Sequence, residues 1–597
     1  MASKKAKKRR IEDESESDSC SSDDEDRYLY TRDDVCVVSD SETDESETDE
    51  SELSESESET DESQLSESES ENDEDQSWSV SGEAREPFPA DSDLGKVNVN
   101  IPFLDRNPES IFEYFFTQEL TESIALHTNI YASKIIKKKI HRKYIDTKIH
   151  EGIQKKRSKS PLWKDTNCDE VKLFLALLIL QGVVKKPNLR LYFTKNKMLA
   201  TPFFGEVIAR NRFEDLLRFM HFTVDSKRSK KEKDYHFFQI LPLLNHLKEK
   251  WQEIYTPERD ISIDESLLLW KGSLTWRTYM PRKRARMGVK SYLLCESSTG
   301  YVYDMLVYTG ESTILSDKVK DLDLKGFNKT SRVVLTLMES RLDKGHRLFL
   351  DNYFSSPKLY DTLARYKTDV VGTVRINRKD LPPDMKDKVL NSGEVCSWYR
   401  GKLMALIWRD KKDVCMLSTI HDGSMKSSKS KRRKARMKPE AVLDYNKGMG
   451  GVDLADQRIN TYAIRKKRLK KFYLKMFLHL IEITVFNSYV IYTKYGAKTR
   501  HLNFLLNLVS NLIQKYSHSI RLERCRKSKT NLARLNERHF ITFNPSTATL
   551  VRPYRRCFVC SRKNKRKASM YRCAKCNVAL CAIPCFEKYH TKEQFVQ

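Results

Sequence analysis

Hydrophobic residues recur at helical spacing between Val97 and Glu258 and at strand spacing after Arg259. The helical pattern, with Thr166 or Asn167 as a candidate cap, is strongest in Ile111–Leu120, Glu170–Gln181, Phe213–His221 and Phe237–Ile254. After Arg259, short runs alternate between apolar and polar residues, which is typical of strands. The pattern therefore predicts an all-α region followed by an α/β region.

The α/β region mixes strands and helices. Strands are predicted at Ile261–Ile263, Leu348–Leu350 and Asp369–Val374, and a hairpin is predicted at Val289–Glu296 and Tyr301–Tyr308. Helices are predicted at Ser331–Gly345 and Ser356–Tyr366. This order favours a mixed sheet flanked by helices, as in an RNase H-like domain.

Residues 375–440 fit a continuing sheet core poorly and are interpreted as an inserted domain. They contain two strand-like runs, Leu403–Trp408 and Val414–Ile420, followed by a basic run, Lys426–Lys438. The basic run could contact DNA, act as a nuclear signal or form a flexible loop. A long amphipathic helix with a DNA-facing side is predicted at Met476–Tyr492, and Tyr473, Phe477 and Phe486 are expected to pack in the core rather than stack on bases.

Acidic residues stand at the ends of two predicted strands. Asp264 and Glu265 follow the first strand, and Asp351 follows the strand at Leu348–Leu350. Asp453 and Asp456 follow a glycine-rich run, and their spacing of three places them on one helix face. Mg²⁺ prefers hard oxygen ligands, so three such acids are predicted to hold two Mg²⁺ ions in an RNase H-like site. These ligands are Asp264, Asp351 and Asp453, whereas Glu265 is expected to point away.

The charge of the chain is distributed unevenly. Residues 11–76 contain 30 Asp or Glu and two Arg, and they include repeats of ETDES, so this segment is predicted to be disordered to about residue 92. The formal net charge is nevertheless +25, which leaves +47 on residues 77–597. A body this basic favours a polyanionic partner such as nucleic acid, although a solvated basic surface is the alternative.

The N-terminus and the apolar runs argue against secretion and against a membrane. Residues 1–10 run directly into acidic sequence without an apolar stretch, and the longest apolar run, Leu173–Leu180, is too short to span a bilayer. Lys4–Arg10 is a candidate nuclear signal. An intracellular, nuclear protein without membrane contact is therefore expected.

Cysteines crowd into the C-terminal segment, with six of the 13 between residues 557 and 585. Two CxxC pairs in this segment can both supply thiolates to tetrahedral zinc. The seven candidate ligands are Cys557, Cys560, Cys573, Cys576, Cys581, Cys585 and His590. Two closed sites need eight ligands, so either another group or water completes the second site, or one Zn²⁺ is bound.

Two basic clusters are candidates for contact with DNA phosphates. The first lies between the early strands, beside the predicted acidic site, and the second precedes the helix at Met476–Tyr492. Their residues are Arg282, Lys283, Arg284, Arg286 and Lys290, and Arg465, Lys466, Lys467 and Arg468. A solvated turn is the alternative interpretation of the first cluster.

Several of these motifs together resemble the piggyBac family of DNA transposases. The matching text includes DESLLLWKG (264–272), FLDNYFSSPKLYDTL (349–363), DYNKGMGGVDLADQ (444–457) and CAKCNVALCAIPCFEKYHT (573–591). The resemblance implies cut-and-paste transposition, with nicking, hairpin formation on the element ends and joining into TTAA targets. It also implies that Asp456 is a fourth required acid, that the protein forms a homodimer on double-stranded DNA, and that the C-terminal segment is a cross-brace with two zinc ions.

The resemblance further implies a division of the chain into domains. The acidic region (1–92) is followed by a dimerisation and DNA-binding domain in two parts (93–258 and 458–540). The catalytic domain occupies 259–374 and 441–457, with the insertion at 375–440. A linker (541–552) leads to the zinc-binding domain (553–597).

Two other functions stay open. The chain could be a domesticated nuclear protein that binds DNA or chromatin without cutting it, or a zinc-finger adaptor for other proteins. The acidic tail could be phosphorylated by an acid-directed kinase and compete with DNA for the basic body, or it could only increase solubility.

Overall fold

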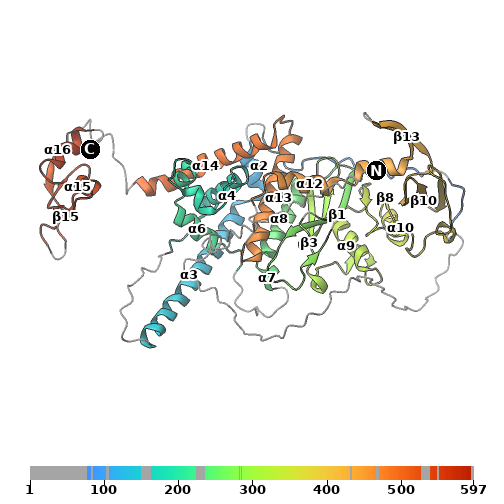
Figure 1. The fold of residues 1–597 in the computed structure, drawn as a ribbon, viewed down its shortest axis with the longest axis horizontal. Coiled ribbons are helices and arrows are strands. Elements are labelled where there is room, and N and C mark those ends of the chain that lie inside the picture. The colour runs from blue at the N-terminus through green and yellow to red at the C-terminus, as the bar shows by residue number, and fades with distance from the viewer. Residues whose placement is uncertain are drawn as a thin grey trace, which may run out of the picture. The chain divides into compact units, whose positions relative to one another are not determined.

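The computed structural model describes residues 77–82, 85–102, 106–149, 163–223, 235–281, 283, 285–430, 433–464, 469–525, 538–547 and 550–592. The chain divides into two compact units, residues 1–516 and 517–597. Figure 1 shows the helices and the sheet of the first unit and the small second unit with α15 and α16.

Helices make up the part of the first unit that precedes the sheet, as predicted. Asn167 caps α4, since its side chain accepts a hydrogen bond from the Glu170 N–H. The segment predicted as one helix, Phe237–Ile254, is two helices, because Pro242 begins a new one. The helices are α2 (Pro108–Phe115), α3 (Gln118–Ile149), α4 (Cys168–Val183), α5 (Pro202–Val207), α6 (Arg210–Phe219), α7 (Tyr235–Phe238) and α8 (Leu241–Ile254).

Two long helices from later in the chain return to this helical part: α13 (Phe472–Lys494) packs on α2 and α8, and α14 (His501–Cys525) hydrogen-bonds to α2. By length and composition α13 could cross a membrane, but 94% of its most apolar window is buried inside the protein. The prediction of an amphipathic, DNA-facing helix is therefore wrong here, because α13 is enclosed on all sides. Tyr473, Phe477 and Phe486 are buried, which confirms that they pack in the core.

A nine-stranded mixed sheet forms the centre of the first unit, in the order β2-β3-β1-β7-β8-β11-β10-β9, with β4 paired to β3. The β1–β7 and β7–β8 pairs are parallel, and the other pairs are antiparallel. The predicted mixed sheet is thus confirmed. The strands are β1 (Asp260–Leu269), β2 (Thr278–Tyr279), β3 (Met287–Glu296), β4 (Val302–Val307), β7 (Arg347–Leu350), β8 (Asp369–Thr373), β9 (Val395–Arg400), β10 (Leu403–Arg409) and β11 (Asp413–Ser418).

The strands of residues 395–418 continue the main sheet, which differs from the prediction for the insertion. β11 pairs with β8 from Val371 to Thr373, and β10 and β9 follow outward. Phe349 of β7 and Trp408 of β10 belong to one buried cluster, together with Ala441 of α11 (Glu440–Gly448). The part of the segment that projects as a separate ribbon is the hairpin of β12 (Met425–Ser430) and β13 (Arg433–Pro439).

Helices α9 (Lys329–Met338) and α10 (Pro357–Arg365) lie at the two places where helices were predicted between the strands. α12 (Gly451–Thr461) follows α11 and contacts β1 and β3. Figure 1 shows α12 close to β1.

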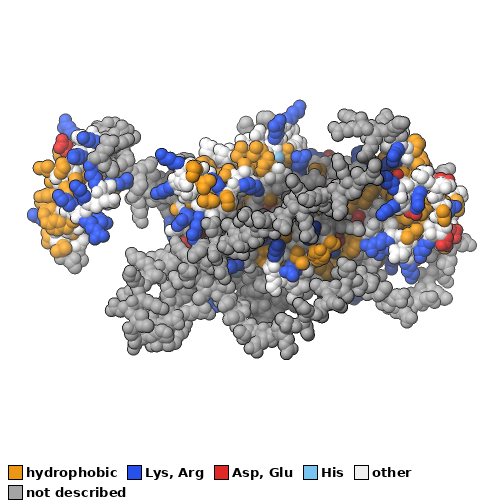
Figure 2. Space-filling view, viewed as in Figure 1, with side chains coloured by type: hydrophobic (Ala, Val, Ile, Leu, Met, Phe, Trp, Pro, Cys, Tyr) orange, Lys and Arg blue, Asp and Glu red, His pale blue; other side chains and the backbone are white. Residues whose placement is uncertain are grey.

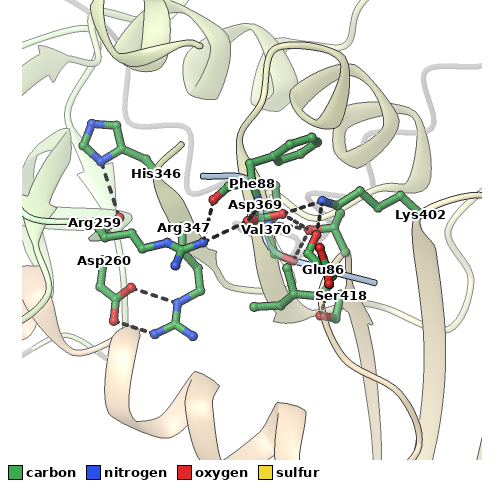
Figure 3. A network of polar contacts seen from close by, with 12 residues as sticks. Glu86, Phe88, Arg259, Asp260, His346, Arg347, Asp369, Val370, Lys402 and Ser418 are labelled. Atoms are coloured by element: carbon green, nitrogen blue, oxygen red, sulfur yellow. Dashed lines mark hydrogen bonds and ion pairs between the residues drawn. The ribbon is translucent and has the colours of Figure 1, made fainter. Parts of the chain in front are cut away.

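Residues 85–92 lie on the sheet, so the predicted disorder does not extend to residue 92. Fully buried Asp369, at the start of β8, accepts a hydrogen bond of 2.9 Å from the Phe88 N–H. Figure 3 shows the same carboxylate with Arg259 at 3.4 Å and Lys402 at 3.1 Å. Ser79 forms a β-bridge with Tyr399 of β9. Residues 1–76, for which disorder was also predicted, lie outside the described residues.

Candidate functional site

Asp264 and Asp351 occupy matching positions on the neighbouring parallel strands β1 and β7. The last paired residues of β1 and β7 are Ile263 and Leu350, and an acid follows directly in each strand. β7 ends there, whereas β1 continues to Leu269 because β3 still pairs with it. Asp264 therefore lies within β1 rather than at its end, at the point where β1 loses β7 as a neighbour.

Burial and like charges raise the pKa of both carboxyl groups. The pKa of Asp264 is raised to about 6, mainly by burial and in addition by the charges of Asp351 and Glu265, while the charge of Lys283 opposes the rise. Burial also raises the pKa of Asp351, while hydrogen bonding from the Tyr353 N–H lowers it. Two half-buried acids that disfavour each other's charge are suited to binding a cation.

Glycines allow α12 to pack closely against β1, which carries Asp264, and against β3. A Cβ on Gly451 would lie 2.5 Å from Ser262 Oγ of β1 and 2.9 Å from the Glu296 carbonyl oxygen of β3. A Cβ on Gly300, whose φ is +77°, would lie 2.9 Å from Ala455 N. Only residues without a side chain allow this approach. The glycine-rich run therefore sets the position of Asp453 and Asp456.

The two acids of α12 have different surroundings. Asp456 Oδ1 accepts a hydrogen bond of 2.8 Å from Ser266 Oγ, and Ser266 shares a face of β1 with Asp264. The Asp453 side chain is 66% exposed, and its Oδ1 lies 3.9 Å from Lys283 Nζ. Asp456 is thus fixed to the strand, while Asp453 faces solvent in the first turn of the helix, where a negative charge is favourable.

Glu265 points to the opposite face of β1, as expected from the alternation of a strand. Its carboxylate lies 3.1 Å from the ammonium of Lys290 on β3. Lys290 is buried between the rings of Tyr292 and Tyr353, whose centroids are 4.9 and 5.0 Å from its Nζ. The predicted contact of Lys290 with DNA is therefore wrong for this conformation, because its charge is already paired and enclosed.

The other predicted DNA contacts are only partly described. Lys283 lies beside the acids, and Arg286 is exposed in the same turn with a φ of +38°. The remaining predicted residues, Arg282, Arg284, Arg465, Lys466, Lys467 and Arg468, lie outside the described residues.

The carboxylates of Asp264, Asp351 and Asp453 are not all within 4.8 Å of one another. In the described part of the chain, three or more candidate ligand atoms meet that distance in two groups, both in the second unit. Two metal ions about 4 Å apart do not require all three carboxylates to lie within 4.8 Å of one another, because each ion has its own ligands and shares only some of them. The oxygen-only donor set and the mutual repulsion of Asp264 and Asp351 fit Mg²⁺.

The second unit contains both of these groups, and each has four ligand atoms. Cys560 Sγ lies 3.5 Å from Cys585 Sγ and 3.9 Å from Cys581 Sγ. In the other group, His539 Nδ1 lies 3.4 Å from the sulfurs of both Cys573 and Cys576. The groups are Cys557, Cys560, Cys581 and Cys585, and His539, Cys573, Cys576 and His590. Both sets fit tetrahedral Zn²⁺.

His539 is the eighth candidate ligand, which the sequence analysis left unassigned. It lies upstream of the segment predicted to bind zinc, beyond the predicted linker. That linker contains β14 (Ile541–Phe543), which pairs with β17 (Tyr571–Cys573) and so brings His539 to the second CxxC pair. In sequence the ligands of the two groups interleave, which is a cross-brace arrangement. A histidine directly before a short apolar run was the signal that could have identified it.

Hydrogen bonds to Cys557 and His590 favour metal binding. Burial raises the pKa of Cys557, but backbone N–H groups of Cys560 and Cys581 outweigh it and hold the pKa below the usual thiol value. The His590 Nδ1 lies 2.7 Å from the Phe586 carbonyl oxygen, which leaves Nε2 for the metal. The unit also contains the helices α15 (Phe558–Arg562) and α16 (Cys585–Thr591) and the strands β15 (Arg555–Arg556), β16 (Ala568–Ser569) and β18 (Val578–Ala579).

The second unit is strongly basic. Residues 538–547 and 550–592 contain 13 Lys or Arg and one acid, Glu587. Figure 2 shows Lys and Arg side chains on the visible face of this unit, among hydrophobic ones. Such a surface favours contact with a polyanion.

Comparisons with known proteins agree with this architecture. A family model described as transposase IS4 matches residues 107–489. The human PiggyBac transposable element-derived protein 3 is 25% identical over 502 residues, covering 82% of this chain and 77% of the relative. The human PiggyBac transposable element-derived protein 2 is 23% identical over 64% of this chain and 61% of its own length.

A solved structure shares the fold. It is the cryo-EM structure of a piggyBac transposase synaptic complex with hairpin DNA. Its TM-score is 0.60 at 23% sequence identity, covering 80% of this chain and 96% of that chain.

Proposed function

The chain belongs to the piggyBac-type transposases of the IS4 family, and on that premise we propose that it cuts and joins DNA in a metal-dependent reaction. The observation that carries the proposal is that Asp264 and Asp351 occupy matching positions on the parallel strands β1 and β7, with α12 packed against β1 through Gly451. An acid on each of two neighbouring parallel strands of a mixed sheet is typical of an RNase H-like catalytic domain.

In this proposal Asp264, Asp351 and Asp453 are the metal ligands. Two Mg²⁺ ions, when bound, would activate an attacking water or 3′-hydroxyl and stabilise the leaving oxygen of a DNA phosphate. Asp456 keeps α12 in place through its hydrogen bond with Ser266. No residue of the chain has to act as a nucleophile, so one site can serve both strand cleavage and strand joining.

The proposed reaction is cut-and-paste transposition with hairpin formation on the element ends and insertion into TTAA targets. The sequence motifs and the basic charge of residues 77–597 support it. The solved relative is described as a synaptic complex with hairpin DNA, which also supports this course. The proposal includes a homodimer, Zn²⁺ in the two C-terminal sites and a nuclear location.

Excision from a donor plasmid tests the proposal. The plasmid carries a marker between the genomic segments that flank the coding sequence, including any inverted repeats next to TTAA. The intact chain should excise the marker in cells and cleave the labelled ends in Mg²⁺, and Asp351→Asn should lose both activities. Asp387→Asn removes a charge from an exposed site and should retain them. Equal excision by all three proteins would overturn the metal-site assignment.

A second candidate is a nuclear DNA-binding protein that does not cut. Two observations favour it: the Asp453 side chain is exposed, and the carboxylates of Asp264, Asp351 and Asp453 do not all lie within 4.8 Å of one another. It predicts that the purified chain binds duplex DNA with strong salt dependence but leaves labelled ends intact in Mg²⁺.

A further inference from the structure

Lys283 places a positive charge among the acids of the candidate active site. Its Nζ donates a hydrogen bond of 2.8 Å to the backbone carbonyl oxygen of Glu265, the residue directly after Asp264. The same Nζ lies 3.9 Å from Asp453 Oδ1. Its charge also acts on Asp264, where it opposes the rise in pKa caused by burial. One ammonium group thus interacts with acids from both β1 and α12.

The backbone of the β2–β3 connection sets this position. The Lys283 N–H donates to the Met280 carbonyl oxygen at 3.1 Å, and the Arg286 N–H donates to the Lys283 carbonyl oxygen at 3.1 Å. Thr278 and Tyr279 then pair with Gly288 and Met287. These backbone hydrogen bonds tie Lys283 to Met280 and Arg286, and its side chain reaches the acids from there.

The chemistry of the ammonium makes it a substitute for a metal ion. Asp264 and Asp351 lie side by side on β1 and β7, and their charges repel. A nearby cation relieves this repulsion, as a divalent ion would. An ammonium group has three donors and no acceptor, so it cannot be a metal ligand, and its charge repels a metal ion. Lysine and metal therefore compete for the same carboxylates.

We propose that Lys283 stands in for a metal cation in the metal-free site and has to move away from Asp453 before Mg²⁺ binds. The proposal rests on the proposed function, because it takes these acids to be the metal ligands. The Lys283 side chain is 29% exposed, so it can swing into solvent without opening the core. While the site is empty, Lys283 then offsets part of its negative charge, and it weakens the affinity for Mg²⁺.

Mg²⁺ titration of the full-length, zinc-loaded chain tests the proposal. The measurements are calorimetry and the thermal unfolding midpoint, which rises when a ligand binds the folded state. Lys283→Gln should bind Mg²⁺ about tenfold more tightly than wild type, because the substitution removes the positive charge that competes with the ion for the carboxylates. Its midpoint without Mg²⁺ should lie below that of wild type, and saturating Mg²⁺ should remove this difference.

Two further variants control the experiment. Lys271→Gln removes the same charge from an exposed lysine and should match wild type. Lys283→Arg keeps a cation in the turn and should bind Mg²⁺ no more tightly than wild type. Zinc content and circular dichroism show whether each variant is folded.

The outcomes separate the two proposals. If Lys283→Gln binds Mg²⁺ no more tightly than Lys271→Gln, Lys283 does not compete with the metal and this inference is overturned. If Asp351→Asn abolishes Mg²⁺ binding in that case, the metal site itself still stands. If the wild-type chain binds no Mg²⁺, both proposals fail.

Discussion

Ser266 Oγ of β1 donates a hydrogen bond of 2.8 Å to Asp456 Oδ1 of α12. This contact joins the strand that carries Asp264 to the helix that carries Asp453, over a sequence separation of 190 residues. It fixes the helix laterally, while Gly451 fixes its distance from the sheet.

Replacing Ser266 by alanine should loosen this connection. A hydrogen bond to a charged group contributes about 1.5–3 kcal/mol, so the free energy of unfolding of Ser266→Ala should fall by about that amount. Its Mg²⁺ affinity should fall as well, because Asp453 moves with α12. Urea unfolding and Mg²⁺ calorimetry measure the two effects. Ser316→Ala, which removes an exposed hydrogen bond of 3.1 Å to Glu339, is the control and should change little.

The two adjacent glycines before Asp453 should respond differently to the same substitution. Gly451→Ala places a methyl group 2.5 Å from Ser262 Oγ and should cost about 1–3 kcal/mol of stability, as overpacking does. Gly450→Ala places its methyl group in open space and should be close to neutral. Thermal unfolding of both variants, with excision assays beside it, checks the difference. Equal losses would show that α12 does not pack as closely on β1 as described.

Asp264 should make the stability of the metal-free protein depend on pH. Burial raises its pKa from the ordinary 3.8 to about 6, so between these values the folded state holds a proton that the unfolded chain has released. Its contribution to stability therefore falls as the pH rises from about 4 to about 6 and is constant above. Urea unfolding without Mg²⁺ should show this loss for wild type relative to Asp264→Asn. Parallel curves of unfolding free energy against pH for the two proteins would contradict the raised pKa of Asp264. Mg²⁺ affinity of wild type should rise over the same interval.

His539→Ala should release one zinc ion and keep the other. The all-cysteine group of Cys557 and its three partners does not use His539, so metal analysis should give one Zn²⁺ per chain against two for wild type. His127→Ala, in α3, is a control that should keep both ions. Two ions in His539→Ala would show that water or another group can complete the site.

Strand and cysteine patterns predicted much of the fold and of the zinc sites. The apolar runs before Asp264 and Asp351 are short and bounded by polar residues, so their periodicity identifies both strands. The two CxxC pairs and the cysteines and histidine that follow them gave seven candidate ligands, and all seven lie in the two groups. Local patterns of this kind do not depend on the rest of the chain.

Features that depend on distant partners were not predicted. β1 continues past Glu265 because β3 pairs with it, and no local sequence pattern indicates that β3 is the partner. Residues 85–92 are held by backbone contacts such as Phe88 N–H to Asp369, which need no apolar periodicity. The role of His539 depends on the pairing of β14 with β17, across an interval of about 30 residues. The burial of Lys290 likewise follows from Tyr353, which is remote in sequence.

The pairing of β11 with β8 has a practical consequence for shortening this protein. A truncated catalytic core without residues 395–418 would leave the outer hydrogen-bonding groups of β8 without a neighbour and uncover Phe349 and Val371. An open apolar sheet edge recruits other chains, so such a fragment would be expected to aggregate. The smallest soluble catalytic fragment therefore has to retain these three strands.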